Sequence, residues 1–336
     1  TQGFAILMAQ DYGAQKWRKL KQTVAHSYRL TAMTAVLLFI ISQAGAYWIL
    51  TFLNTPDNII GMSLLYLRIV FCGIPVVAAY NIFASVLRSL GNSRTPLIAM
   101  VIAAIINIIL DLIFVGQFHM NVAGAALATV IAQAFSAIYC FFAVRKIDIV
   151  HITREDFQTV PGLNRKLLTL GTPILFQDVI ISVGGLVVQF VVNGYGFLFV
   201  AGFTATNKLY GILEMAAISY GYAIVTYVGQ NLGAEKITRI KRGVRASAVL
   251  AFLTSVFISI IMFIFGKRIL TAFISGDPAQ TEQVLNIAWH YLSIMASVLF
   301  ILYFLYVYRS ALQGLGNTII PMISGIVEFF VRVGIA

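Results

Sequence analysis

Two short motifs occur twice in this chain, in the same order and more than 200 residues apart. QDYGAQK at 10–16 returns as QNLGAEK at 230–236, and LGNSRTP at 90–96 returns as LGNTIIP at 315–321. Self-similarity at a long, nearly constant spacing indicates a duplicated fold. In membrane proteins, two homologous halves commonly enclose a binding site between them.

The composition predicts a membrane protein. Hydrophobic residues make up 60% of the 336 residues and charged residues only 10%, whereas soluble domains carry roughly 25% charged residues. Apolar runs of about 18 or more residues recur and are long enough to cross a bilayer. We therefore expect an all-α polytopic membrane protein with about ten helices, at 1–12, 29–52, 61–89, 95–116, 122–145, 167–193, 198–229, 244–266, 283–313 and 318–336.

The basic residues predict the orientation of these helices. Clusters of Lys and Arg lie in alternate connections, around residues 16–21, 145–166 and 236–245, and the opposite connections hold only Lys267 and Arg268. An excess of basic residues marks cytoplasmic loops. Gln10 and Gln230 are separated by an even number of crossings, so both motif copies should lie on the cytoplasmic side, with a pseudo-two-fold axis along the membrane normal.

The same pattern divides the chain into two lobes. Residues 1–145 form the first lobe, residues 146–166 form a cytoplasmic linker, and residues 167–336 form the second lobe. The linker is the one long polar connection, and either an amphipathic interfacial helix or a plain linker fits it.

Several classes of function are disfavoured by the sequence. The net charge of +11 is confined to short clusters between apolar runs, without the basic face of a nucleic-acid module. Cys72 and Cys140 lie in apolar segments, so neither a disulfide nor a metal site is expected. No P-loop and no triad spacing is present, so we expect no enzyme and no cofactor.

Long stretches of the chain resemble the MATE (multidrug and toxic compound extrusion) family. ILMAQDYGAQKWRKLKQTV and TYVGQNLGAEKITRIKRGV are similar to the ends of that family's second and eighth helices, and VLRSLGNSRTPLIAMVIAAIINIILDLIFV with NVAGAALATVIAQ is similar to its fourth-to-sixth helix region. The resemblance implies two homologous six-helix lobes and export of amphipathic, often cationic, small molecules in exchange for Na⁺ or H⁺. It also implies a multi-pass monomer in the plasma membrane. By this resemblance the first helix, part of the second and the last helix are absent here, and with them an Asp that many members carry on the first helix.

Four of the twelve acidic residues fall within predicted spans, where ionisable groups are functional candidates. Glu214 is the first candidate for cation coupling, with an ion pair to Lys208 as the rival interpretation. Asp178 is the second, because Pro173 should free a backbone carbonyl that could join the carboxylate in an oxygen-ligand site.

The other two acids have less specific predicted roles. Asp111 follows Asn107 by four residues near the outer end of its helix. Both could face the central cavity, but depth favours a structural or interfacial role for Asp111. Glu328 and Arg332 are four apart on one helix face and predict an internal ion pair, with substrate contact as the alternative. Uncharged candidates for a cavity lining are Asn81, Gln133, Gln177, Gln189 and Asn207.

Three functions remain open from the sequence. A cation-coupled exporter is favoured. A flippase for lipid-linked saccharides would need several Arg or Lys residues in its cavity to hold pyrophosphate, and only Lys208 and Arg332, with Arg68 near a helix end, are offered. A non-transporting membrane receptor or assembly protein is the third possibility.

Overall fold

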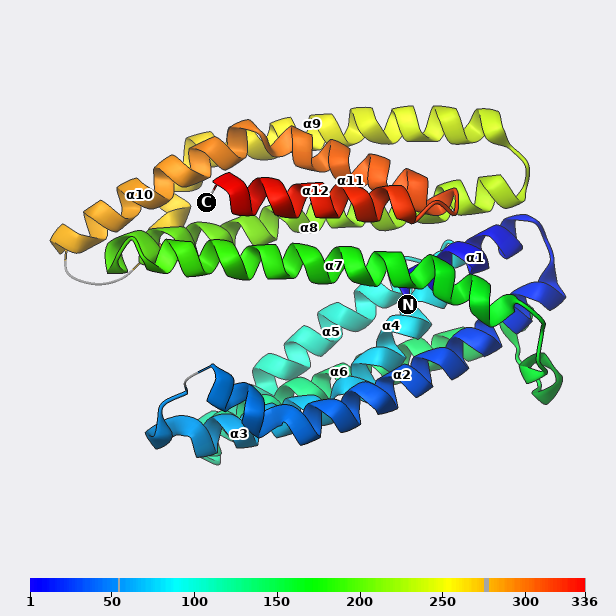
Figure 1. Ribbon diagram of the computed structural model, residues 1–336, viewed down its shortest axis with the longest axis horizontal. Coiled ribbons are helices and arrows are strands. Elements are labelled where there is room, and N and C mark those ends of the chain that lie inside the picture. Colours follow the sequence, from blue (N-terminus) through cyan, green and yellow to red (C-terminus); the bar gives the residue numbers. More distant parts are fainter. Residues whose placement is uncertain (54, 275–277, 336) are drawn as a thin grey trace. The chain divides into compact units, whose positions relative to one another are not determined.

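The computed structural model describes residues 1–53, 55–274 and 278–335, and their regular secondary structure is helical. Figure 1 labels the elements, whose bounds are α1 Gln2–Gly13, α2 Trp17–Phe52, α3 Asp57–Cys72, α4 Ile74–Ser89, α5 Arg94–Asp111, η1 Leu112–Gln117, α6 Asn121–Arg145, η2 Asp148–Val150, η3 Arg154–Phe157, α7 Leu163–Asn193, α8 Phe197–Gly233, α9 Ile237–Leu270, α10 Pro278–Ser297, α11 Leu299–Gly314 and α12 Ile319–Ile335. The predicted all-α fold class is confirmed.

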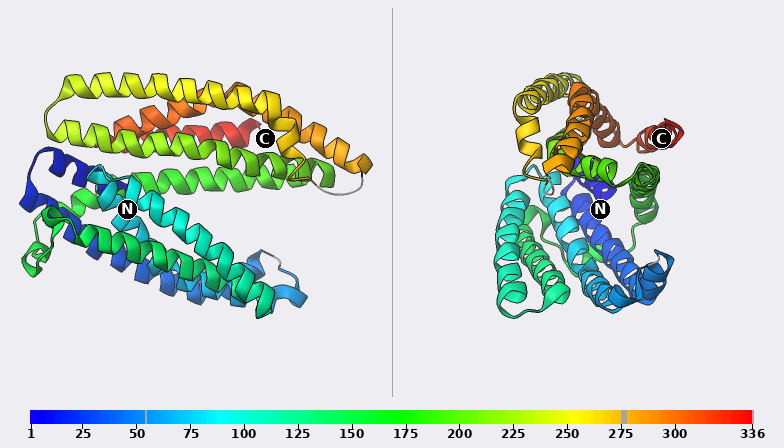
Figure 2. Two further views of the ribbon diagram at one scale, coloured as in Figure 1. Left: turned by 180° about the vertical axis from the view of Figure 1, so that it is seen from behind. Right: turned by 90° about the vertical axis from the view of Figure 1, so that its left-hand side faces the viewer.

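The chain forms two compact units, Thr1–Leu168 and Thr169–Ala336. In unit 1, α6 packs against α3, α4 and α5, and α2 packs against α3 and α4. In unit 2, α8 packs against α9, α10 and α11, and the long α8–α9 hairpin can be followed in both ribbon views (Figures 1 and 2). The core of unit 2 is built around Tyr303 and Leu292, which are both fully buried.

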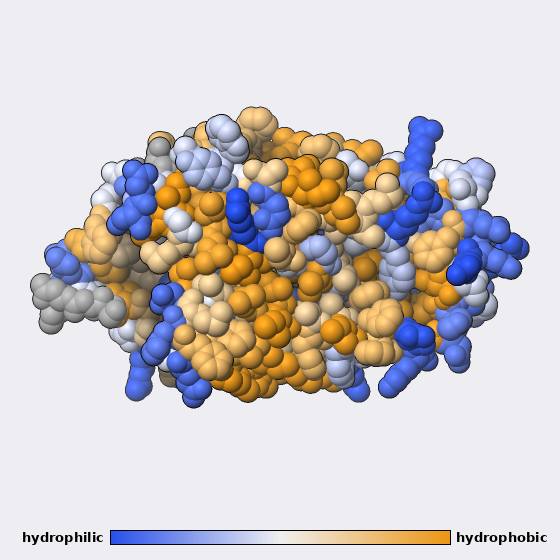
Figure 3. Space-filling model, turned by 90° about the horizontal axis from the view of Figure 1, so that it is seen from below, coloured by the Kyte–Doolittle hydropathy of each residue, from blue (hydrophilic) through white to orange (hydrophobic). Residues whose placement is uncertain are grey.

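The helices have the length and surface of membrane spans. Seven helical spans in the part of the chain that the structure describes are long and apolar enough to cross a bilayer, and the bent α10–α11 pair makes an eighth. Large apolar side chains such as Trp48 and Phe190 are exposed, and on the face drawn in Figure 3 apolar residues fill the middle while hydrophilic residues gather toward the two ends. A surface of this kind is matched to lipid.

The first repeated motif adopts the same turn in each unit. Gln15 and Glu235 both have positive φ, at 55° and 59°. The amide of Lys16 donates to the Asp11 carbonyl at 3.0 Å, and the amide of Lys236 donates to the Asn231 carbonyl at 2.8 Å. The two copies of this motif therefore have the same local backbone structure.

The second motif is also duplicated in structure. Gly91 and Gly316 both have φ of 88°, a conformation that side chains with a Cβ disfavour. The side-chain oxygen of Asn92 accepts from the Thr95 amide at 3.1 Å, and that of Asn317 accepts from the Ile320 amide at 3.2 Å. In each unit the glycine ends one helix and the asparagine satisfies an amide of the next.

A break in one span recurs at the matching position of the two units. Gly73 separates α3 from α4 and Val298 separates α10 from α11, the same offset as between Gly91 and Gly316. The α10–α11 pair is bent by 48°. Pro75 at the start of α4 lacks an amide proton and so cannot continue the hydrogen bonds of α3.

The segment that follows α6 is docked on α2. Two short turns, η2 and η3, pack against α2, and Thr153 and Asp156 form a capping box in η3. His26 on α2 is buried; its Nε2 donates to the Gln158 carbonyl at 3.0 Å, and its Nδ1 lies 2.7 Å from Asn164 Oδ1. The segment therefore forms short turns held against α2 and no continuous amphipathic helix.

We expect His26→Ala to release this segment, because it removes both of its side-chain contacts with α2. Trypsin should then cleave the purified protein faster between Lys146 and Lys166. The control is His290→Ala, since His290 is exposed and its ring bonds the Asn286 carbonyl of its own helix. Equal cleavage rates in the His26 variant and the unmodified protein would show that the histidine does not hold the segment.

Candidate functional site

The four membrane-depth carboxylates divide between the units. Asp111 lies in unit 1, at the end of α5, whereas Asp178, Glu214 and Glu328 lie in unit 2, on α7, α8 and α12. Three of the four candidate acids therefore belong to the second unit.

In unit 1, Asp111 is an acid with an unpartnered oxygen. Its Oδ1 is buried and has no hydrogen-bond partner among the described residues. Asn107, one turn earlier on the same face, lies with its Nδ2 3.5 Å from Thr129 Oγ1 on α6. Asp111 is about 25 Å along its span from Arg94, at 1.5 Å per residue. Three oxygen-bearing side chains are thus gathered where α5 meets α6.

The backbone beside Asp111 departs from the α-helix. Leu112–Gln117 forms a π-helical turn, a distortion that is frequent at functional sites. This turn lies close to α6, because a Cβ added at Gly124 would stand 3.0 Å from the Cβ of Phe114. The regular α-helix of α5 therefore ends at Asp111, and the wider π-helical turn begins directly after it. The sequence signals neither the π-helical turn nor the neighbouring Thr129.

In unit 2, Glu214 is held by a tyrosine. The hydroxyl of Tyr306 on α11 donates to Glu214 Oε1 at 2.8 Å. Among the described residues no ion pair joins Glu214 to Lys208, which is exposed. Six helical positions turn the chain by about 600°, so the two side chains point about 120° apart. The rival interpretation, a pair with Lys208, is therefore not found.

Glu328 is shared by two arginines. The expected pair with Arg332 is present, and Arg309 on α11 contacts the other carboxylate oxygen at 2.9 Å. Arg309 also donates to the hydroxyl of Ser324, from Nε at 3.1 Å and from NH2 at 2.8 Å. The sequence does not reveal the Arg309 partnership, because Arg309 and Glu328 lie on different helices.

Aromatic residues connect Glu214 with the arginines. Tyr306, which donates to Glu214, precedes Arg309 by three residues on α11, so the two side chains lie on one helix face. Tyr210 lies one turn before Glu214 on α8. The hydroxyl of Tyr291 on α10 donates to Asn207 Oδ1 at 3.4 Å, and its ring stacks on Phe203 at 5.2 Å. We call the group of Tyr210, Glu214, Tyr306, Arg309, Glu328 and Arg332 the unit 2 charge cluster.

The carbonyl freed by Pro173 does not lie beside Asp178. That carbonyl belongs to Thr169, four residues before the proline, and the hydroxyl of Thr318, just before α12, lies 3.5 Å from it. Asp178 itself is exposed, and nine residues of helix separate it from Thr169 by about 13 Å. An oxygen-ligand site made of these two groups is not formed.

The uncharged candidates differ in their surroundings. Gln177 is buried, and its Oε1 has no partner among the described residues. Its Cγ would be 2.8 Å from a Cβ added at Gly325, so α7 and α12 approach closely there. Asn81 is exposed on α4, and Asn207 accepts the hydrogen bond from Tyr291.

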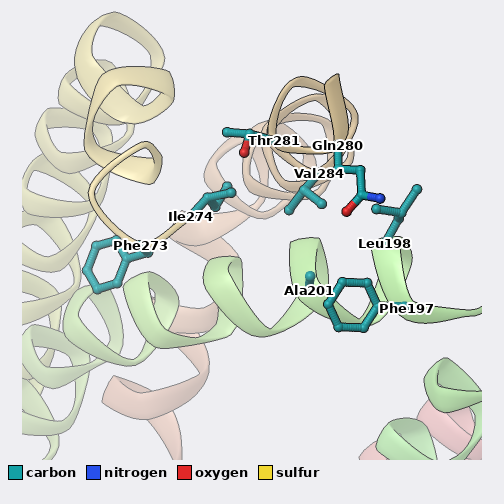
Figure 4. A pocket seen from close by; sticks show the side chains of 8 residues that line it. All are labelled: Phe197, Leu198, Ala201, Phe273, Ile274, Gln280, Thr281 and Val284. Atoms are coloured by element: carbon teal, nitrogen blue, oxygen red, sulfur yellow. The ribbon is translucent and has the colours of Figure 1, made fainter. Parts of the chain in front are cut away.

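A small pocket lies where α8 and α10 begin. It has a volume of about 150 Å³ and contains none of the four carboxylates; Figure 4 shows its lining of Phe197, Leu198, Ala201, Phe273, Ile274, Gln280, Thr281 and Val284. Six of the eight lining side chains are apolar, and Gln280 and Thr281 are the polar ones. None of the four candidate carboxylates therefore lines this pocket.

The comparisons with known proteins agree on one family. The MatE family model matches residues 1–113 and 173–336. The chain is 28% identical over 301 residues to the probable multidrug resistance protein YoeA of Bacillus subtilis, covering 86% of this chain and 65% of that protein. It is 33% identical over 248 residues to the probable multidrug resistance protein YpnP of the same organism, covering 72% and 55%. The chain thus spans less than two thirds of the length of these two relatives.

Solved structures give the same fold. A transporter of the MOP superfamily from Pyrococcus furiosus superposes with a TM-score of 0.92 at 20% identity, covering 98% of this chain and 73% of that one. An outward-facing multidrug resistance MATE family transporter superposes with a TM-score of 0.91 at 18% identity, covering 98% and 73%. The predicted resemblance and the two-lobed fold are confirmed. The chain belongs to the MatE family, a family of multi-pass membrane transporters and not of enzymes.

Proposed function

We propose that the protein exports amphipathic small molecules and draws its energy from a cation gradient. Membership of the MatE family and the multidrug resistance names of its relatives support this function. The site of action would be the plasma membrane, with the basic loops in the cytoplasm and a single chain sufficient for transport.

The observation that carries the proposal is the unpartnered oxygen of Asp111. A buried carboxylate at membrane depth costs several kcal/mol unless it is paired or neutralised. H⁺ or Na⁺ would neutralise Asp111, with Asn107 and Thr129 as neighbouring oxygen donors. Proton or cation occupancy of this group would couple the gradient to transport.

Glu214 and Asp178 remain alternative coupling sites. Glu214 already accepts a hydrogen bond from Tyr306 and lies in a cluster with two guanidinium groups, which repel a further cation. Asp178 is exposed and has no oxygen ligand from the Pro173 turn. We therefore propose Asp111 as the first candidate for the coupling site, ahead of Glu214 and Asp178.

Coupling requires that the cation and the substrate favour different conformations. A ligand shifts a conformational equilibrium only by its differential affinity for the two states. A charged Asp111 carboxylate costs more free energy when water is excluded from the α5–α6 contact than when water reaches it. Neutralisation by a cation would remove this cost and so favour the conformation that excludes water. The bundle at 1–145 would then rock against the bundle at 167–336 in alternating access.

The other two functions are less well supported. A saccharide flippase would need free basic groups inside its cavity to hold pyrophosphate. Arg309 is instead paired with Glu328 and Ser324, and Lys208 and Arg68 are exposed. A receptor without transport gives no reason for an unpartnered carboxylate within a span.

Accumulation of a fluorescent cationic dye in cells tests the function. We expect cells that make the protein to accumulate less dye than cells without it. Collapse of the H⁺ and Na⁺ gradients with an uncoupler and a sodium ionophore should remove the difference. A difference that persists after both gradients are collapsed would rule out secondary transport.

A further inference from the structure

The start of α9 carries a cluster of basic side chains without acidic partners. Its members are all exposed and are Lys236, Arg239, Lys241, Arg242 and Arg245. The ion pairs among the described residues involve none of them, and none involves Glu235, the exposed acid that precedes the cluster. Most of the positive charge at this end of α9 is therefore uncompensated.

The three arginines lie on the outer side of α9. At about 100° of helix per residue, Arg242 is in line with Leu253 and Ile260, which are 57% and 52% exposed. Arg239 and Arg245 lie about 60° to either side of that line. The buried side of α9 packs against α8, α10 and α11, and α9 runs along the edge of unit 2 in both ribbon views (Figures 1 and 2). The arginines therefore share the side of α9 that meets lipid.

The depth of the arginines matches the headgroup region of a bilayer. No charged residue lies between Arg245 and Lys267, and α9 rises about 33 Å between them at 1.5 Å per residue. That length is close to the roughly 30 Å of the hydrocarbon core. Arg242 and Arg239 lie about 4.5 Å and 9 Å further out along the helix. The three guanidinium groups therefore lie at the level of the lipid phosphates of one leaflet.

The matching helix of unit 1 lacks this arrangement. Lys16 and Lys236 are equivalent residues of the repeated motif, so α2 and α9 can be aligned from that point. The residues of α2 that correspond to the three arginines are Lys19, Gln22 and Ala25. The fold thus forms this helix start without an arginine cluster.

The acid that neutralises a lysine in unit 1 is also missing from unit 2. Asp11 is buried, accepts a hydrogen bond from Thr23 and lies 3.6 Å from the Nζ of Lys19. Its counterpart is Asn231, whose amide donates to the Tyr227 carbonyl of its own helix. Unit 2 therefore has more positive charge at this level and no buried acid to balance it.

We propose that Arg239, Arg242 and Arg245 form a binding site for the headgroup of an anionic phospholipid of the surrounding leaflet. Guanidinium groups bind phosphate in a bidentate manner, and the acyl chains of the lipid would lie along the exposed apolar side of α9 below Arg245. The inference goes beyond the proposed export function and does not depend on it.

The charge of the cluster favours an anionic lipid over a zwitterionic one. Each basic side chain near the surface adds to the attraction of a lipid with net negative charge. In a zwitterionic headgroup, the ammonium or choline group beside the phosphate is repelled by the same arginines. The site should therefore select phosphatidylglycerol over phosphatidylcholine.

A tryptophan placed next to the arginines tests this selection. Val249 is 58% exposed and lies one turn deeper than Arg245, so Val249→Trp reports on the acyl chains of a lipid bound there. The protein is reconstituted in vesicles of equal parts phosphatidylglycerol and phosphatidylcholine, with bromine on the acyl chains of one lipid at a time. After subtraction of the signal from protein without the reporter, quenching should show a preference of about fivefold for phosphatidylglycerol.

Replacing all three arginines with glutamine in the reporter protein should remove most of that preference. Replacing them with lysine keeps the charge and should retain part of it, which guards against a variant that misfolds. The matched control is Lys267→Gln with Arg268→Gln, at the other end of α9. Equal quenching by the two lipids, or a preference that the glutamine variant retains, would overturn the proposal.

Soluble phosphate compounds are distinguished by competition. Salt should weaken the preference by screening, and glycerol phosphate should weaken it no more than NaCl of the same ionic strength. A larger effect of glycerol phosphate would assign the arginines to a soluble phosphate compound and would overturn the lipid as their ligand.

Discussion

Asp111→Asn is expected to abolish gradient-driven dye efflux and to leave the fold intact. The amide has the shape of the carboxylate and is less costly to bury, but it cannot take up a proton or attract a cation. Efflux from cells or vesicles should fall to the level of cells without the protein. The amount and thermal stability of the variant should match those of the unmodified protein.

The matched control is Asp57→Asn, an exposed aspartate in the first turn of α3 in the same unit. It should transport normally, because its carboxylate is solvated at the end of a span. Normal efflux by Asp111→Asn would move the coupling site to Glu214 or Asp178, and Glu214→Gln would then be the variant that stops transport.

Glu328→Gln should lower the stability of the protein far more than Asp111→Asn does. It removes the one carboxylate that contacts both Arg309 and Arg332. Removing one partner of a fully buried ion pair costs about 3–5 kcal/mol. We expect a smaller loss here, because the side chains of Arg309 and Glu328 are 11% and 19% exposed. The midpoint of thermal unfolding in detergent should therefore fall markedly.

A second substitution distinguishes this explanation from general damage. Arg309→Gln in the Glu328→Gln background removes the least exposed unpaired charge and should restore part of the lost stability. No change of the midpoint in Glu328→Gln would mean that the two arginines find other partners and that the cluster does not stabilise unit 2.

Much of the fold follows from the sequence because the bilayer imposes length and polarity on each span. The predicted spans correspond to observed helices, and the duplicated motifs have equal backbone geometry at Gln15 and Glu235 and at Gly91 and Gly316. Length alone does not reveal the breaks at Gly73 and Val298, since each broken pair still has the apolar length of one span.

The candidate sites can be predicted from the sequence less completely than the fold, because their chemistry depends on contacts between helices. Helical spacing identifies the Glu328–Arg332 pair, which lies on one helix face. It cannot identify Tyr306 as the partner of Glu214, or Thr129 beside Asn107, since those residues come from other helices. Depth along a span favours a structural role for Asp111, whereas its buried and unpartnered oxygen is what points to a cation.

The most direct test of coupling at Asp111 is the effect of the cation on substrate affinity. The methyl ester of a rhodamine dye keeps a fixed positive charge at every pH of interest. Its affinity for the purified protein can therefore be measured by fluorescence anisotropy across rising H⁺ or Na⁺ concentration. Linkage requires that a cation which opposes the substrate lowers its affinity. We predict that dye affinity falls as the coupling cation is raised in the unmodified protein and stays constant in Asp111→Asn. The same dependence in both proteins would contradict coupling at this residue.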